Sequence, residues 1–449
     1  MLMSAAERQS VEAQQDDWRA WFLLALLCFA FILSMLDRTV ISLLVEPIKA
    51  DLGLTDTGIA LLQGATFAIF YALTGVPIGW LADRSNRRNI VSAGIGLWSV
   101  MTILCGLAVG YATLFLARTG VAVGEAALNP AAYSMLSDRF SKAKLGRAIG
   151  IFTAAGVVGT GLALLIGGKL YSYFVLQGGL DIGWNLKPWQ ATFVAVGTPG
   201  LILALLVFFC VSEPQRTGRV EKPQARKDEN SGAGAYAFIR SNRAIYAPLL
   251  GGYGILCIVG YAFVSWGPAS LGRVYGLSPS DIGGKFGMIM LIFGSLGPIL
   301  GGLACDRLIK NGQSNGPVLC LLIAAALCLF FAIVLLGSSS LTVTWIAYAG
   351  IAFGFTAMLA SVPIAIQLLT PSEFRARIAA LSLVSANVIG LGIGPLLVGL
   401  LNDNVFTGTA GIATSLPLVL AVSAFVGFVV VWPARRVSVM ADSRPSPAL

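Results

Sequence analysis

The chain of 449 residues contains no histidine, and only 11% of its residues are charged. The absence of histidine excludes catalytic triads and metal sites that depend on an imidazole ring. A soluble domain has about 25% charged residues, so this chain cannot cover a water-facing surface with polar groups. Hydrophobic residues make up 57% of the chain, and we therefore expect an integral membrane protein.

Several other features are missing. The seven cysteines lie in or beside apolar stretches and form no Cys-x-x-Cys pair, so we expect free thiols. No Walker motif follows a strand-like segment, which excludes ATP-driven transport within this chain. The sequence also offers no nucleophile–base pair and no metal cluster. We expect no enzyme activity, no cofactor and no metal, and the polar first residues do not form a secretory signal.

Apolar stretches recur along nearly the whole length, and a membrane-spanning helix needs about 20 such residues. Between polar breaks they predict twelve spans in an all-α membrane protein. The expected spans are 19–45, 56–82, 89–109, 112–136, 146–171, 189–212, 244–272, 279–305, 316–337, 341–369, 376–401 and 412–433.

The spans divide into two halves separated by a charged segment that is poor in apolar residues. We expect a tail (1–18), a six-helix bundle (19–212), a linker (213–243), a second six-helix bundle (244–433) and a final tail (434–449). Of the 30 Lys and Arg residues, 23 fall on the side of both tails, which makes that side cytoplasmic. This asymmetry accounts for much of the formal charge of +9, so we do not expect nucleic-acid binding.

The two halves repeat a loop. "GWLADRSNRR" (79–88) follows the second span and "GLACDRLIKNG" (302–312) follows the eighth. In both loops a glycine precedes an aspartate by four positions, and an arginine follows the aspartate directly. Parallel six-helix repeats of this kind predict two pseudo-symmetric bundles that face each other across a central cavity.

The loop at 79–88 resembles the loop motif of the major facilitator superfamily, and the resemblance covers all twelve spans. "LDRTVIS" (36–42) and "ARTGVAVGEAALNPAAYSMLSDRF" (117–140) are similar to the spinster branch of that superfamily. The resemblance implies a secondary transporter of lysophospholipids or sphingoid phosphates, with proton coupling. It also implies a monomer.

The repeated loops are expected to latch the cytoplasmic ends of the two bundles when the cavity opens outward. A glycine there lets helices pack closely, an aspartate pairs with a base or a helix N-terminus, and arginines bind carboxylates or phosphates. The alternative is a basic loop that only sets topology. The latch residues are Gly79, Asp83, Arg84, Arg87, Arg88, Asp306 and Arg307.

Four ionisable residues fall well inside predicted spans: Asp37, Arg38, Arg118 and Glu125. Each charge at a helix centre costs about 2.5–3.5 kcal/mol, so they must face one another or water. Neighbours on a helix point about 100° apart, so Asp37 and Arg38 are not each other's main partner. The resemblance places both spans beside the cavity, where Arg38 approaches Glu125 and Asp37 approaches Arg118 or points into the bundle.

The fourth span carries a polar stripe. Arg118 and Glu125 share one helix face, and Asn129 and Tyr133 continue it at steps of four. We expect Arg118, Arg38, Asn129 and Tyr133 to bind the substrate or to act as counter-ions. The rival interpretation is a buried ion-pair network that only fixes helix packing, although such pairs are poor stabilisers.

Asp37 and Glu125 are the expected proton-coupling carboxylates, because burial and a nearby arginine act on them in opposite directions. The partners are then a small-molecule or lipid substrate, protons and membrane lipids. Alternatives are a small organic anion such as a sugar acid or aromatic acid, transport without protons, or a non-transporting receptor. We expect a bacterial inner membrane protein with both termini in the cytoplasm.

Overall fold

The structure, a computed structural model, describes residues 16–181, 183–214, 237–313, 315–408 and 410–436. Over these residues the chain is almost entirely helical. The two strands found there, β1 (Leu180–Asp181) and β2 (Asn185–Leu186), form a short antiparallel hairpin. The predicted all-α membrane fold is confirmed.

The first half contains the following helices, several of them joined end to end. They are α2 (Trp18–Thr39), η1 (Val40–Leu43), α3 (Val45–Leu52), α4 (Asp56–Ala60), η2 (Leu61–Ala65), α5 (Thr66–Arg84), α6 (Arg87–Gly106), α7 (Tyr111–Glu125), α8 (Leu128–Arg139), α9 (Lys142–Gln177) and α10 (Pro188–Cys210). Here η1 is a 3₁₀ helix and η2 is a π-helical turn.

The second half is built in the same way. Its helices are α12 (Arg243–Tyr275), α13 (Pro279–Ile289), η3 (Met290–Gly294), α14 (Ser295–Lys310), α15 (Gly316–Leu336), α16 (Leu341–Leu369), α17 (Ser372–Ser385), η4 (Ala386–Leu391), α18 (Gly392–Asn404), α19 (Ile412–Val431) and η5 (Trp432–Arg436). The π-helical turns η2 and η3 interrupt the second and the eighth predicted span, which are the spans that the repeated loops follow.

Within the described residues, 11 helical segments are long and apolar enough to cross a membrane. They correspond to eleven of the twelve predicted spans. The remaining one, the fourth, is divided into α7 and α8 by a turn at residues 126–127. The sequence predicted one continuous helix there. The interruption follows directly after Glu125, and neither α7 nor α8 is long enough to cross a membrane alone.

Local sequence explains where several helices begin. Asp17 caps α2 by accepting a hydrogen bond from the N–H of Ala20 at 2.8 Å. Thr55 caps α4 and Asn86 caps α6 in the same manner. Such side chains satisfy N–H groups that have no partner within the helix. These caps therefore determine the residues at which the helices begin.

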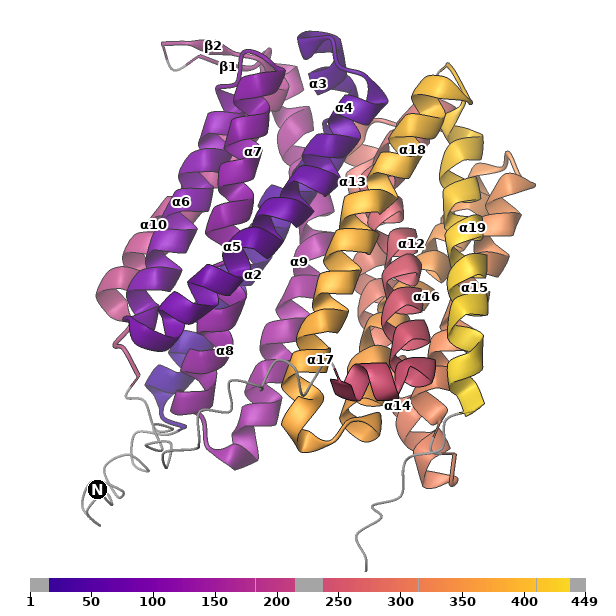
Figure 1. The fold of residues 1–449 in the computed structure, drawn as a ribbon. Coiled ribbons are helices and arrows are strands. Elements are labelled where there is room, and N and C mark those ends of the chain that lie inside the picture. The colour runs from indigo at the N-terminus through magenta and orange to yellow at the C-terminus, as the bar shows by residue number, and fades with distance from the viewer. Residues whose placement is uncertain (1–15, 182, 215–236, 314, 409, 437–449) are drawn as a thin grey trace, which may run out of the picture. The chain divides into compact units, whose positions relative to one another are not determined.

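The chain forms two compact units, residues 1–227 with 267–291, and residues 228–266 with 292–449. We call the first of these unit 1. In unit 1 the helices run alongside one another, with α3, α4 and the hairpin at one end (Figure 1). We call the other end, where α2 begins and α10 ends, the tail end. The line between these two ends is the direction in which the helices would cross the membrane.

Glycines hold α13 against α9 within unit 1. A Cβ on Gly283 would lie 2.3 Å from the carbonyl oxygen of Leu164, and one on Gly287 would lie 2.8 Å from that of Gly161. Small residues at this spacing let the backbones of membrane helices touch. The small residues Gly161 and Gly168 of α9 therefore pack directly against α13.

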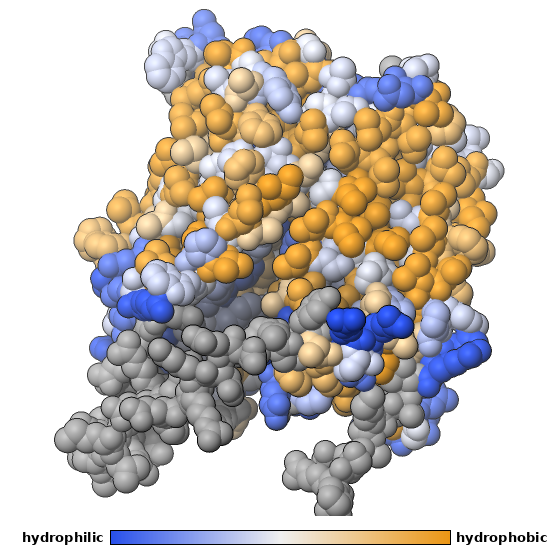
Figure 2. Space-filling model, viewed as in Figure 1, coloured by the Kyte–Doolittle hydropathy of each residue, from blue (hydrophilic) through white to orange (hydrophobic). Residues whose placement is uncertain are grey.

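The surface of unit 1 has the polarity that a membrane requires. On the face seen in Figure 2, apolar side chains cover the middle height, and hydrophilic side chains gather toward both ends. On α5 the exposed fractions are 64% for Leu73 and 78% for Val76. Such exposure of apolar side chains is favourable in lipid and not in water.

Candidate functional site

The interruption of the fourth span places Glu125. Gly124 lies against α6, where an added Cβ would be 2.7 Å from the backbone nitrogen of Trp98. This close approach fixes the end of α7, and the chain turns at residues 126–127 before α8 begins. Glu125 is the last residue of α7 and is 2% exposed. Its carboxylate therefore lies inside unit 1, midway along the span.

Arg38, in the last turn of α2, meets this carboxylate. Its Nη2 donates to Oε2 of Glu125 at 2.5 Å, and 21% of the Arg38 side chain is exposed. The predicted approach of Arg38 to Glu125 is confirmed. The pair joins the first and fourth spans.

Two aromatic rings of α5 surround the same arginine. The Arg38 guanidinium carbon lies 4.1 Å from the ring centre of Phe67 and 5.6 Å from that of Tyr71. The ring faces attract the cation and hold it in place. Asn129 donates from its amide to the Tyr71 hydroxyl at 3.1 Å, which brings α8 to the site.

Tyr133 lies one helical turn beyond Asn129. Its ring meets Phe152 edge-on, with centroids 5.5 Å apart, and 40% of the side chain is exposed. Phe152 in turn stacks on Phe31. Tyr133 therefore lies on the polar stripe of the fourth span, and its ring belongs to an aromatic group with Phe152 and Phe31.

Asp37 and Arg118 form the other part of the site. Arg118 donates from Nη1 to the backbone carbonyl of Asp37 at 3.0 Å, and both side chains are almost fully buried. The contact joins the same two spans as the Arg38–Glu125 pair. It runs through the backbone of Asp37 rather than through its carboxylate.

Four polar positions in this cluster have no hydrogen-bond partner among the described residues. They are Oδ1 of Asp37, Oε1 of Glu125, and Nε and Nη2 of Arg118. A buried polar group without a partner costs about 1–3 kcal/mol, and a charged one costs more. We call Asp37, Arg38, Arg118 and Glu125 the central cluster. Its open donors and acceptors can bind a proton or an anionic ligand.

Sequence analysis missed three residues of this site. Phe67 and Tyr71 surround Arg38, and Gln63 lies on the same helix face one turn before Phe67, in the π-helical turn η2. Gln63 is 4% exposed, and neither of its amide atoms has a partner among the described residues. The signal was "QGATFAIFY" (63–71), in which a lone amide and two aromatic residues recur every four positions.

At the tail end, Arg87 lies in a separate group of polar residues. Its Nε donates to Glu213 at 2.8 Å, its Nη1 to the Ser134 hydroxyl at 2.9 Å and to Asp138, and its Nη2 to the Pro214 carbonyl at 2.7 Å. The Arg87 side chain is 1% exposed. We call Arg87, Asp138 and Glu213 the tail-end cluster, and sequence analysis did not identify its two acidic members.

The other predicted latch residues of the first loop have different surroundings. Arg88 stacks on Phe208, with its guanidinium carbon 5.1 Å from the ring centre, and Arg84 lies 3.7 Å above the ring of Trp80. Among the described residues no atom lies within 4 Å of a Cβ added to Gly79, and the expected close helix packing there stays a prediction. The side chain of Asp83 lies outside the described residues.

The second copy of the loop differs. Asp306 and Arg307 are both exposed on the last turns of α14. Arg87 and its partners come from one unit, and Asp306 and Arg307 belong to the other. The role of all these residues as a latch stays a prediction.

A third ionic group lies at the end of unit 1 that carries α3 and α4. Arg273 of α12 donates to both carboxylate oxygens of Asp56, at 2.5 and 2.7 Å, and to Glu46 at 2.7 Å. Lys49 also binds Asp56. Only 3% of the Asp56 side chain and 6% of the Arg273 side chain are exposed. Sequence analysis used Lys49 and Arg273 only for topology.

Comparison with known proteins agrees with this geometry. Residues 27–395 match the family model of the Major Facilitator Superfamily. An "MFS-type efflux pump" of Mycolicibacterium smegmatis is 29% identical over 417 residues, which are 92% of each chain. A "Probable L-galactonate transporter" of Escherichia coli is 28% identical over 298 residues, 64% of this chain and 62% of that protein.

The fold also resembles a solved structure. It is a crystal structure of a bacterial homologue of the human lysosomal transporter spinster, in an inward-facing and unoccupied conformation. The TM-score is 0.79 at 25% sequence identity, over 96% of this chain and 100% of the other.

Proposed function

The chain belongs to the major facilitator superfamily of membrane transporters and resembles its spinster branch, and from this premise we propose that it couples proton movement to transport of an amphipathic anion. The central cluster carries the proposal. Asp37, Arg118 and Glu125 are buried, whereas 21% of the Arg38 side chain is exposed. Within the described residues, the three buried side chains keep polar atoms without a hydrogen-bond partner. A purely structural ion network would satisfy these atoms.

The arginines supply the anion site in this proposal. A guanidinium presents several N–H donors in a plane that matches phosphate or carboxylate. Arg118 keeps two donor positions open, and Arg38 is held between Glu125 and the rings of α5. The aromatic group around Phe67 and Tyr71 offers an apolar wall for the remainder of the ligand.

The carboxylates supply the proton site. Burial favours the neutral form of a carboxyl group, and a neighbouring guanidinium favours the charged form. An anion that draws Arg38 or Arg118 away would therefore promote protonation of Glu125 or Asp37. Release of the anion would reverse the change. This exchange links the movement of substrate to the movement of protons.

Alternating access would expose the central cluster to each side in turn. We propose that the halves 19–212 and 244–433 move relative to each other, with the tail end in the cytoplasm of a bacterium and the protein acting as a monomer. The contacts of Arg273 with Asp56 and Glu46 would then break when the α3–α4 end opens, and the predicted latch would form at the tail end.

A second candidate substrate is a small organic anion. The similarity to the probable L-galactonate transporter favours it, because a sugar acid also presents one carboxylate to paired arginines. The lipid proposal rests instead on the likeness to the spinster homologue and on the aromatic wall beside Arg38.

Flux in proteoliposomes tests both candidates. A lysophospholipid and L-galactonate would be offered with and without a pH gradient to wild type, Glu125→Gln and Asp37→Asn. Asp181→Asn, in the exposed hairpin, is the matched control. We expect the pH gradient to accelerate lysophospholipid flux in the wild type and in the control. At least one of the two site variants should show no such acceleration. Proton-dependent flux retained in both site variants would refute the coupling, and flux of L-galactonate alone would replace the lipid.

A further inference from the structure

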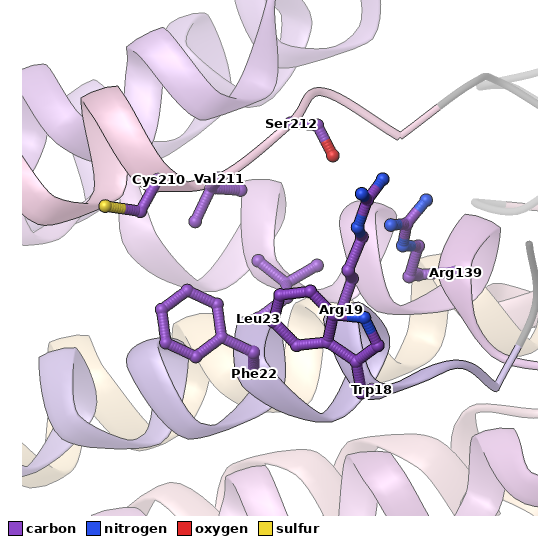
Figure 3. Close-up of a pocket in the computed structure, with 8 residues that line it drawn as sticks. All are labelled: Trp18, Arg19, Phe22, Leu23, Arg139, Cys210, Val211 and Ser212. Carbon is purple, nitrogen blue, oxygen red and sulfur yellow. The ribbon is translucent and has the colours of Figure 1, made fainter.

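A pocket opens at the tail end of unit 1, away from the central cluster. Its volume is about 240 Å³, and it lies between the start of α2, the end of α8 and the segment after α10 (Figure 3). The lining residues are Trp18, Arg19, Phe22, Leu23, Arg139, Cys210, Val211 and Ser212. None of them belongs to the site proposed for transport.

Two arginines give the pocket its charge. The guanidinium groups of Arg19 and Arg139 lie beside each other below Ser212, and no carboxylate is among the lining residues (Figure 3). Arg139 is 8% exposed, and its Nη2 is 3.9 Å from Oδ2 of Asp17. Asp17 already caps α2. Asp17 compensates one of these two cations, which leaves a net positive charge that an anion would neutralise.

Most of the remaining lining is apolar, and Trp18 and Phe22 are exposed. Trp18 is 70% exposed and Phe22 is 38% exposed, on the first turns of an apolar span. Tryptophan at the end of a span marks the level of lipid headgroups. An occupant of this pocket therefore meets a pair of cations at headgroup level and apolar side chains along the hydrocarbon.

We propose that this pocket binds the phosphate of an anionic phospholipid from the surrounding bilayer. Guanidinium groups bind phosphate through paired N–H donors, and basic pockets between membrane helices suit anionic headgroups. The acyl chain of the lipid would run along Phe22. The proposal depends on membrane insertion and not on the transport cycle, so failure of one leaves the other standing.

Cys210 offers a direct readout of occupancy. Its thiol lines the pocket and is exposed, whereas Cys28 is half-buried and the other five cysteines are buried. A maleimide should label Cys210 first in detergent-purified protein. Phosphatidylglycerol should slow this labelling, and phosphatidylcholine with the same acyl chains should not.

Native mass spectrometry of the full chain would measure the affinity. We expect phosphatidylglycerol to bind about tenfold more weakly to Arg19→Gln and to Arg139→Gln, because each loses a charged hydrogen-bond donor to phosphate. Arg436→Gln is the matched control, since Arg436 is exposed close to an exposed tryptophan, Trp432, at the end of another span. Arg19 is exposed, so its variant keeps the test valid if Arg139→Gln fails to fold.

Several outcomes would overturn the proposal. They are equal binding of phosphatidylglycerol and phosphatidylcholine, wild-type affinity in Arg19→Gln, and labelling of Cys210 that neither lipid alters. Inorganic phosphate that protects Cys210 as well as the lipid does would assign the pocket to a free anion instead. Weaker binding of phosphatidylglycerol to Phe22→Ser would support the lipid.

Discussion

The central cluster and the tail-end cluster are both buried ionic groups of unit 1, but they differ in completeness. Every guanidinium nitrogen of Arg87 donates to an oxygen, from Asp138, Ser134, Glu213 or Pro214. Within the described residues, Arg118 donates from one nitrogen, and the carboxylates of Asp37 and Glu125 each keep one oxygen without a hydrogen-bond partner. The complete network fixes helix ends, and the incomplete one retains capacity for a ligand.

The same substitution in both clusters should lower stability by different amounts. Arg87→Met leaves Asp138 and Glu213 without their cation, and we expect a loss of about 3–5 kcal/mol in stability. Thermal unfolding in detergent would measure it, with Arg436→Met as an exposed control. A variant as stable as wild type would mean that the tail-end cluster contributes nothing to folding.

Arg118→Met makes the corresponding change in the central cluster. Because Arg118 donates one hydrogen bond, to the backbone carbonyl of Asp37, we expect a loss of stability of about 1–3 kcal/mol, smaller than that of Arg87→Met. Substrate flux should fall about tenfold or more, since a charged donor to the anion is lost. A loss of stability as large as that of Arg87→Met would show that both clusters are structural.

The aromatic wall of the site should have a smaller effect. Phe67→Leu removes the ring face that lies 4.1 Å from Arg38, and a cation–π contact contributes about 0.5–1 kcal/mol. We expect the apparent affinity for substrate to fall about two- to fivefold with unchanged maximal flux. Phe425→Leu, on an exposed ring of α19, is the control. An unchanged affinity would remove Phe67 from the site.

The smallest effect should come from substitution of Asp16, whose carboxylate accepts hydrogen bonds from Ser141. Burial raises the pKa of Asp16, but hydrogen bonds from Ser141 outweigh it and hold the pKa below its ordinary value of 3.8. The stabilisation is then present above pH 3.8 and is lost as pH falls through the lower pKa of the folded state.

Asp16→Asn should therefore lower stability at neutral pH by less than about 1 kcal/mol. Melting curves of variant and wild type should converge below pH 3.8, the ordinary pKa of the group. Ser141→Ala should act in the same direction. A difference that grows as the pH falls would contradict the assigned cause.

The sequence predicted the spans well because the cost of inserting a segment depends on that segment alone. The family resemblance predicted the Arg38–Glu125 pair, because it places the first and fourth spans beside one cavity. Sequence analysis missed the turn at residues 126–127, because Ala126 and Ala127 favour a helix and the turn follows from packing of Gly124 on α6.

Partner choice over long distances was harder to predict. Arg87 binds Asp138 and Glu213, and Arg273 binds Asp56, across large separations in the chain. Many surface charges were equally plausible partners for these residues. Phe67 and Tyr71 were hidden for a different reason, since aromatic residues are common in every apolar span and only their contact with Arg38 distinguishes them.

The glycine seam between α9 and α13 has a mechanical consequence. At Gly168 and Gly283 an added Cβ would meet backbone atoms of the other helix first, and at Gly161 and Gly287 it would meet a leucine side chain first. Attraction across this surface is dispersion, which weakens sharply over the first ångström of separation. A side chain larger than hydrogen at Gly168 or Gly283 would therefore hold the two helices apart and remove that attraction.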